Sequence, residues 1–114
     1  MVPFAIGELR GAKVYIRPDT EAVGPDIARQ ARRDALLRDS IVYLTCLHEL
    51  GHALGLRHTD EFADIMYSFQ YGGDIVEYFT RYRRQIKSRI DIATTSGLSA
   101  ADAEHLQAIY RSMR

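Results

Sequence analysis

The chain is short of cysteine, of net charge and of long apolar runs, and each shortage excludes a class of protein. Its single cysteine, Cys46, excludes an intramolecular disulfide framework. The 15 Lys and Arg residues balance 15 Asp and Glu residues, which disfavours nucleic acid as a partner. No apolar run approaches the roughly 18 residues of a membrane-spanning helix, so we expect no membrane partner.

What is present fits an ordinary globular domain. The 114 residues are 46% hydrophobic and 26% charged, and we expect one domain over residues 1–114. The first ten residues have no basic start followed by an apolar stretch, so no signal peptide is visible. The sequence therefore predicts a cytoplasmic chain, or a piece of a longer secreted one. The small size also suggests a homodimer that completes the buried surface.

Hydrophobic periodicity predicts one short strand followed by helices. Residues Ala12 to Ile16 alternate and are β-branched or aromatic at their centre, which predicts a strand. Asp39 and Ser40 either cap a new helix or lie inside one long helix. The ranges expected to be helical are 27–38, 41–54, 74–89 and a last helix after a capping box of Ser99 and Asp102.

The strongest motif is His48-Glu49-Leu50-Gly51-His52 on the second predicted helix. Histidines four residues apart project from one face of a helix, where they can take two corners of a tetrahedral zinc site. Glu49 lies about 100° round the helix from His48, too far to join the ligands easily. Its carboxylate can instead reach a metal-bound water and act as the general base.

A third histidine completes this pattern. His58 comes six residues after His52, so the chain must reverse for it to reach the same metal. Gly55 stands where the helix should end, because glycine tolerates the left-handed conformation of a helix C-terminus. Three protein ligands leave a fourth position open, which favours a catalytic over a structural site.

The full pattern resembles that of the metzincin metallopeptidases, and the later sequence resembles their matrixin branch. Met66 lies eight residues after His58 and precedes Tyr67, in the manner of a matrixin Met-turn. The resemblance implies one zinc ion per chain and an apolar floor formed by Met66. It covers residues 48–67 strongly and 97–110 weakly.

The resemblance also implies a fold and a place for the substrate. We expect an α+β fold of the zincin or metzincin type, with a small N-terminal sheet, a long active-site helix and two further helices. Metzincins pair substrate with an edge strand above the zinc, which makes Val14 and Tyr15 substrate-binding candidates, against a purely structural strand. Tyr67 and Tyr71 are candidates for polarising the scissile carbonyl or lining a pocket, against simple packing roles.

The chain departs from matrixins in several places. Thr59 follows the third histidine where Ser is usual, and Ser68 follows the Met-Tyr pair where Pro is usual. Residues 74–96 look like an insertion. The insertion carries a basic run, which is either a solvated face or a surface for an acidic partner or substrate: Arg81, Arg83, Arg84, Lys87 and Arg89.

Three functions compete on these observations. The first is a zinc-dependent metalloendopeptidase acting on peptides or proteins, with Glu49 activating the water. The second is a zinc-dependent hydrolase of another substrate such as RNA, which the basic run favours and Glu49 with Met66 disfavours. The third is a non-proteolytic metzincin-like binding protein, which the short N-terminal region favours.

Overall fold

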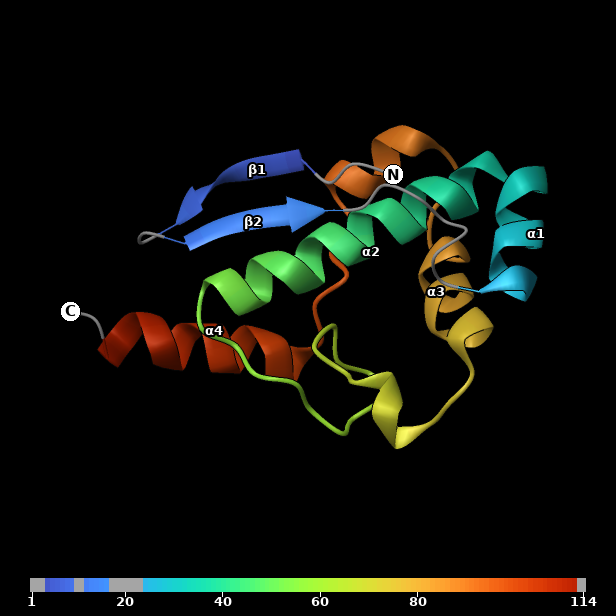
Figure 1. Ribbon diagram of the computed structural model, residues 1–114. Coiled ribbons are helices and arrows are strands. Elements are labelled where there is room, and N and C mark those ends of the chain that lie inside the picture. The colour runs from blue at the N-terminus through green and yellow to red at the C-terminus, as the bar shows by residue number, and fades with distance from the viewer. Residues whose placement is uncertain (1–3, 10–11, 17–23, 113–114) are drawn as a thin grey trace.

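The computed structural model describes residues 4–9, 12–16 and 24–112 of the chain (Figure 1). In the two strands, and at Phe69, it describes the backbone alone. The elements in chain order are β1 (Phe4–Leu9), β2 (Ala12–Ile16), α1 (Pro25–Arg33), α2 (Ala35–Ala53), η2 (Phe69–Tyr71), α3 (Ile75–Arg83), η3 (Arg89–Ala93) and α4 (Ala100–Ser112). The η elements are short 3₁₀ helices.

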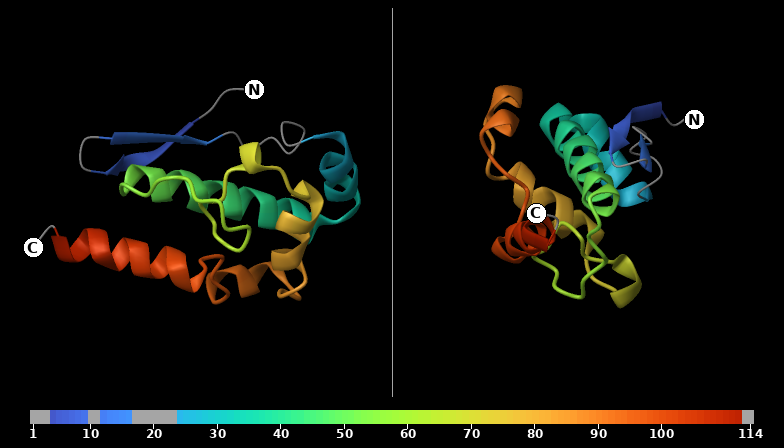
Figure 2. Two further views of the ribbon diagram at one scale, coloured as in Figure 1. Left: turned by 90° about the horizontal axis from the view of Figure 1, so that it is seen from below. Right: turned by 90° about the vertical axis from the view of Figure 1, so that its left-hand side faces the viewer.

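The predicted fold class is wrong, because helix dominates the described part of the chain. That part holds four α-helices rather than three, and the sheet layer of a zincin-like α+β fold is not found in it. Within the described residues the strands β1 and β2 pair only with each other, as an antiparallel hairpin with an irregularity between Ala5 and Gly7. A lone hairpin is too small to form a layer of its own, since a stable sheet needs three or more strands. The hairpin lies along α2 instead (Figures 1 and 2).

A break between α1 and α2 accounts for the additional helix. Asp34 has an extended backbone, and its carboxylate accepts hydrogen bonds from the backbone N–H groups of Leu36 and Leu37 at 3.1 Å each. It therefore caps α2, because a carboxylate satisfies N–H groups that the first turn leaves free. Of the two alternatives for Asp39 and Ser40, a helix cap is not found, and both residues lie inside α2.

The core forms where α1, α3 and the loop after α2 meet the central helix α2. Figure 2 shows α2 running through the middle of the molecule, with the other elements around it. The α3 helix contributes the buried aromatic side chains Tyr78, Phe79 and Tyr82. The predicted helix 74–89 therefore exists but ends at Arg83, and its apolar face packs as its spacing predicts. No described helix is both long and apolar enough to cross a membrane.

The last helix begins at the predicted capping box. The N–H of Ser99 donates to the Asp102 carboxylate at 2.9 Å, and the N–H of Asp102 donates to the Ser99 hydroxyl at 3.0 Å. From there α4 extends back toward the end of α2, where Ile109 lies beside Gly55. This arrangement brings the start of α4 close to the loop that follows α2.

Candidate metal centre

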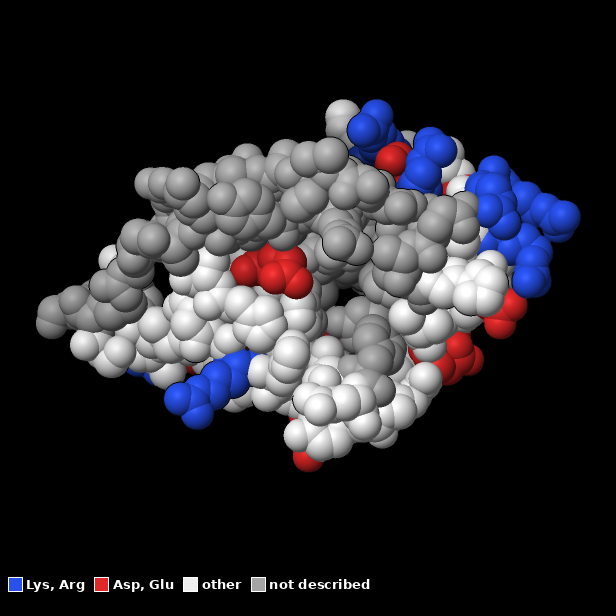
Figure 3. Space-filling view, viewed as in Figure 1, with Lys and Arg blue, Asp and Glu red and all other residues white. Residues whose placement is uncertain are grey.

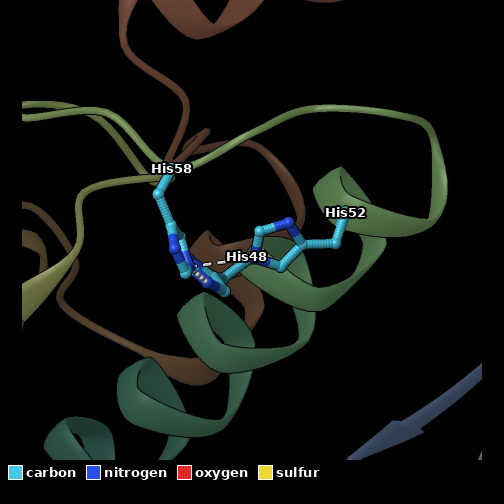
Figure 4. A group of neighbouring side chains, drawn as sticks. All are labelled: His48, His52 and His58. Atoms are coloured by element: carbon cyan, nitrogen blue, oxygen red, sulfur yellow. Dashed lines mark hydrogen bonds between the residues drawn. The ribbon is translucent and has the colours of Figure 1, made fainter.

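The three predicted histidine ligands converge in the structure. His48 and His52 reach out from α2, and His58 reaches back toward them from the following loop (Figure 4). The Nε2 atom of His58 lies 3.0 Å from that of His52 and 3.3 Å from that of His48. All three ligand atoms lie within 4.8 Å of one another, and no other group of this kind occurs among the described residues.

The hydrogen bonds of the Nδ1 atoms show which ring nitrogen of His48 and of His52 is free to bind a metal. The Nδ1 atom of His48 lies 2.7 Å from the carbonyl oxygen of Ile65, and that of His52 lies 2.9 Å from the carbonyl oxygen of Leu56. A carbonyl only accepts, so each Nδ1 must carry the proton and donate it. The Nε2 atoms of these two rings are then unprotonated and carry lone pairs. Both Nε2 atoms lie close to that of His58.

This arrangement fits a zinc ion. Lone pairs on converging nitrogens repel one another unless a cation or a shared proton lies between them. Zinc–nitrogen bonds of about 2.0–2.1 Å in a tetrahedral site separate the nitrogens by about 3.4 Å, close to the 3.3 Å between His48 and His58. Carbonyl acceptors on the far nitrogens are also the usual partners of metal-binding histidines. The three side chains can therefore hold a divalent metal ion.

The reversal that brings His58 to the site is built at the end of α2. Gly55 has φ of +104°, as the sequence predicts for the residue that ends the helix. The N–H of Leu56 donates to the carbonyl of Gly51 at 2.8 Å, and the N–H of Gly55 donates to that of His52 at 3.0 Å. These two bonds form a Schellman motif, which turns the chain back along the helix.

Met66 lies beneath the helix turn that carries the histidines. Its side chain is 1% exposed, and a Cβ atom added to Gly51 would lie 2.5 Å from its sulfur. Gly51 sits between His48 and His52 in the sequence, so the absence of a side chain there lets the sulfur approach the helix backbone. Met66 therefore packs directly against the helix turn that carries His48 and His52.

Two buried carboxylates hold the Met66 loop in place. Asp64 accepts hydrogen bonds from the hydroxyls of Thr59 and Ser99, each at 2.7 Å. Asp102 accepts the backbone N–H of Ile65 at 2.7 Å, from the first turn of α4. Thr59 thus anchors the loop through the hydroxyl that Ser and Thr share. The capping box predicted from sequence therefore has a second role, which is to tie α4 to the metal-site loop.

Glu49 lies beside the triad and is half-buried. Burial lowers the pKa of His58, and the neighbouring His52 and His48 lower it further, whereas the charge of Glu49 raises it. A lowered pKa keeps His58 neutral, which is the form that binds metal. Glu49 thus provides a carboxylate next to the metal-binding face.

A pocket of about 230 Å³ opens beside the triad. Its lining includes His48 and His58 together with the hydroxyl-bearing residues Thr45 and Ser68. The remaining walls are apolar or aromatic and come from α2, the loop and α3: Leu44, Tyr67, Tyr78 and Phe79. A concave, mostly apolar site with a few polar groups is the usual form of a ligand pocket.

The other predicted site residues differ in their exposure and in whether they line the pocket. Tyr67 lines the pocket but is 6% exposed, and its hydroxyl donates to the carbonyl of Gly72, which removes it from contact with a substrate carbonyl. Tyr71 is 62% exposed at the end of η2. Val14 and Tyr15 lie in β2, where only the backbone is described. Cys46 is half-buried, and burial raises the pKa of its thiol.

Most arginines of the basic run at residues 81–89 already form ion pairs or ring contacts within the chain. Arg83 forms an ion pair with Asp34 at 2.9 Å, and Arg84 forms one with Glu77. The Arg81 guanidinium lies 4.5 Å from the centre of the Tyr78 ring. Figure 3 shows that most of the Lys and Arg side chains on this face gather over α1 and the adjoining part near η3, with a smaller group toward the opposite end.

Sequence reasoning missed the residues that support the site from a distance. Tyr78 donates its hydroxyl to the same Ile65 carbonyl that accepts His48, at 2.9 Å. Asp64 was not singled out either, although it directly precedes Ile65 and Met66. The spacing of a local motif cannot reveal such contacts, because they depend on how α3 and α4 pack against the loop.

Comparison with known proteins matches part of the chain to one family. Residues 27–78, just under half of the chain, match the model of the matrixin peptidase family. A search of curated proteins and a search of solved structures found no match. The matched segment runs from α1 to Tyr78 and includes the histidine triad and the Met66 loop. This segment is therefore matrixin-like, and the likeness is to a family of zinc metallopeptidases.

Proposed function

We propose that the chain is a zinc-dependent metalloendopeptidase. The observation that carries the proposal is the convergence of three Nε2 atoms, with the Glu49 carboxylate near enough for its charge to act on His58. His48, His52 and His58 would hold one zinc ion per chain. The matrixin-like segment supports a peptide as the substrate, since that family consists of peptidases.

Within this proposal the protein residues divide the chemistry between them. A bound zinc ion supplies Lewis acidity, which polarises a peptide carbonyl and lowers the pKa of a water molecule. Glu49 takes the proton of the attacking water and delivers it to the nitrogen of the departing amine. Met66 acts as the floor of a Met-turn that keeps the helix turn with the histidines rigid.

The pocket beside the triad supplies a position for a substrate side chain. Its apolar walls and its volume of about 230 Å³ suit an uncharged, apolar side chain of the substrate. The backbone of β2 lies along α2 and supplies main-chain groups for an extended peptide, with Val14 and Tyr15 at its centre. Tyr71, which is exposed, would contact substrate from the loop after Met66.

The alternatives receive less support. Arg83 and Arg84 of the basic run are already paired with acids, which weakens the argument for RNA. A non-proteolytic binding protein would have no need of a carboxylate beside an open metal site. A homodimer remains an expectation from chain size alone.

The test is to replace Glu49 with Gln. We expect the purified wild-type chain to bind one zinc per molecule and to cleave members of a mixed fluorogenic peptide library. Glu49→Gln should lower the cleavage rate by about 100-fold or more, because it removes the general base. Elemental mass spectrometry should still find zinc in this variant.

A matched control is Glu61→Gln, which neutralises an exposed acid in the loop outside the site. This variant should keep both zinc and activity. Full cleavage by Glu49→Gln would reject the mechanism, and cleavage that survives complete removal of the metal would reject zinc dependence.

A further inference from the structure

The carbonyl of Ile65 is held from two sides. It accepts the Nδ1–H of His48 at 2.7 Å and the hydroxyl of Tyr78 at 2.9 Å. The same hydroxyl lies 3.1 Å from the carbonyl oxygen of Asp64. A carbonyl oxygen has two lone pairs, so both donors can bind it at once. Tyr78 therefore fixes the direction of the acceptor that orients the imidazole of His48.

Tyr78 is itself held rigidly. It is 4% exposed, and its ring packs against Phe62 with 5.6 Å between the centroids. The guanidinium of Arg81 lies over the Tyr78 ring at 4.5 Å and over the Phe62 ring at 5.0 Å. The Nε of Arg81 also donates to the Tyr78 carbonyl at 3.1 Å. A side chain buried and packed in this way can transmit the position of α3 to the Ile65 carbonyl.

The other helical ligand is oriented by purely local structure. His52 donates to the carbonyl of Leu56, whose own N–H is bound to Gly51 in the turn that ends α2. His48 instead depends on a loop carbonyl 17 residues away, and that carbonyl is bound by a residue of another helix. His48 is thus the ligand whose orientation depends on the packing of α3.

We propose that Tyr78 is a positioning residue for the metal ligand His48, acting through the carbonyl of Ile65. The helix α3 is then a working part of the metal site rather than a surface element alone. This inference rests on the proposed function only in that the triad binds a metal. It concerns the affinity of the site and does not require that the chain cleaves peptides.

The experiment compares Tyr78→Phe with Tyr82→Phe. Both variants remove one buried hydroxyl of α3 that donates to a backbone carbonyl, since Tyr82 donates to Thr95 at 2.5 Å. Only Tyr78 contacts the carbonyl that orients His48. Zinc affinity is measured by competition with a chromophoric chelator. We expect Tyr78→Phe to weaken zinc binding by about tenfold or more, and Tyr82→Phe to leave it within about twofold.

A second measurement follows the Nδ1–H of His48 in the metal-free chain. Nitrogen-15 NMR of the imidazoles should show faster solvent exchange of the His48 Nδ1–H in Tyr78→Phe than in the wild type or in Tyr82→Phe. Equal zinc affinities for Tyr78→Phe and the wild type would overturn the inference, as would equal losses in both variants. A wild-type chain that binds no zinc would overturn the proposed function as well. A chain that binds zinc tightly but cleaves nothing would overturn only the proposed function.

Discussion

At the scale of single residues, the site depends on the missing side chain of Gly51. The Met66 sulfur occupies the space in which a Cβ atom would stand, and Leu56 lies 3.3 Å from the same point. Elsewhere in a helix, replacing Gly with Ala stabilises the folded state by about 1 kcal/mol. Here the added methyl group must displace Met66, and overpacking of a core costs about 1–3 kcal/mol.

We therefore expect Gly51→Ala to lower the free energy of unfolding and to weaken zinc binding. Urea denaturation of a double-mutant cycle with Met66→Ala isolates the cause. In the Met66→Ala background, Gly51→Ala should lose most of its cost, since the sulfur is no longer there to be displaced. The same destabilisation in both backgrounds would mean that Met66 and Gly51 do not share this space.

At the scale of elements, the junction of α1 and α2 is set by Asp34. Its carboxylate caps α2 and also accepts the guanidinium of Arg83 at 2.9 Å, which ties the start of the metal-binding helix to α3. Burial raises the pKa of Asp34, but the hydrogen bond and charge of Arg83 and the N–H groups of Leu37 and Leu36 lower it more. The net shift of the pKa is downward from 3.8.

Two substitutions of Asp34 separate its role as the cap of α2 from its ion pair with Arg83. Asp34→Ala should lower the free energy of unfolding by about 1 kcal/mol through loss of the cap alone, whereas Asp34→Asn keeps a capping oxygen but loses the charge and the second oxygen that accepts Arg83. Because the folded-state pKa is depressed, the charge contributes stability above pH 3.8 that disappears as the pH falls below it. Urea denaturation at pH 7 and at pH 3 should show a difference between wild type and Asp34→Asn that shrinks at the lower pH. A difference that grew in acid would contradict this assignment.

How far the sequence predicts these elements depends on how local their contacts are. The triad follows from His48, His52 and His58, because helix geometry and the turn at Gly55 place them whatever surrounds them. The boundary at Asp34 was missed because Asp39 and Ser40 carry equally good capping chemistry. The fold class was wrong because one alternating segment, Ala12 to Ile16, does not reveal how many other strands will pair with it. The role of Tyr78 needs tertiary packing, which one sequence does not reveal.

At the scale of the whole molecule, a metal ion held by the triad would add a further link between α2 and the loop after it. The triad links α2 to the loop after it, and that loop is tied in turn to α4 by Asp102 and to α3 by Tyr78. A ligand that binds only the folded chain stabilises it by about 2.7 kcal/mol when its concentration is 100 times its Kd.

We accordingly expect zinc to raise the thermal unfolding midpoint of the wild-type chain. His58→Ala should abolish most of this rise and should lose zinc in elemental analysis, while remaining folded because His58 is exposed. His105→Ala is the matched control, since His105 is an exposed histidine of α4 outside the triad. An equal rise in His58→Ala would show that zinc stabilises the chain from another site.

The turn at Gly55 has a further consequence for the order in which the chain assembles. All three histidines lie within residues 48–58, so their approach requires only a short loop to close, an event that takes about 10–100 ns. The contacts that orient His48 and secure the Met66 loop come from Tyr78 and Asp102, much later in the sequence. Newly made chain can therefore bring its imidazoles together well before the groups that hold them firmly have arrived. In the proposed zinc site, capture of the metal and its tight retention would become separate events during folding.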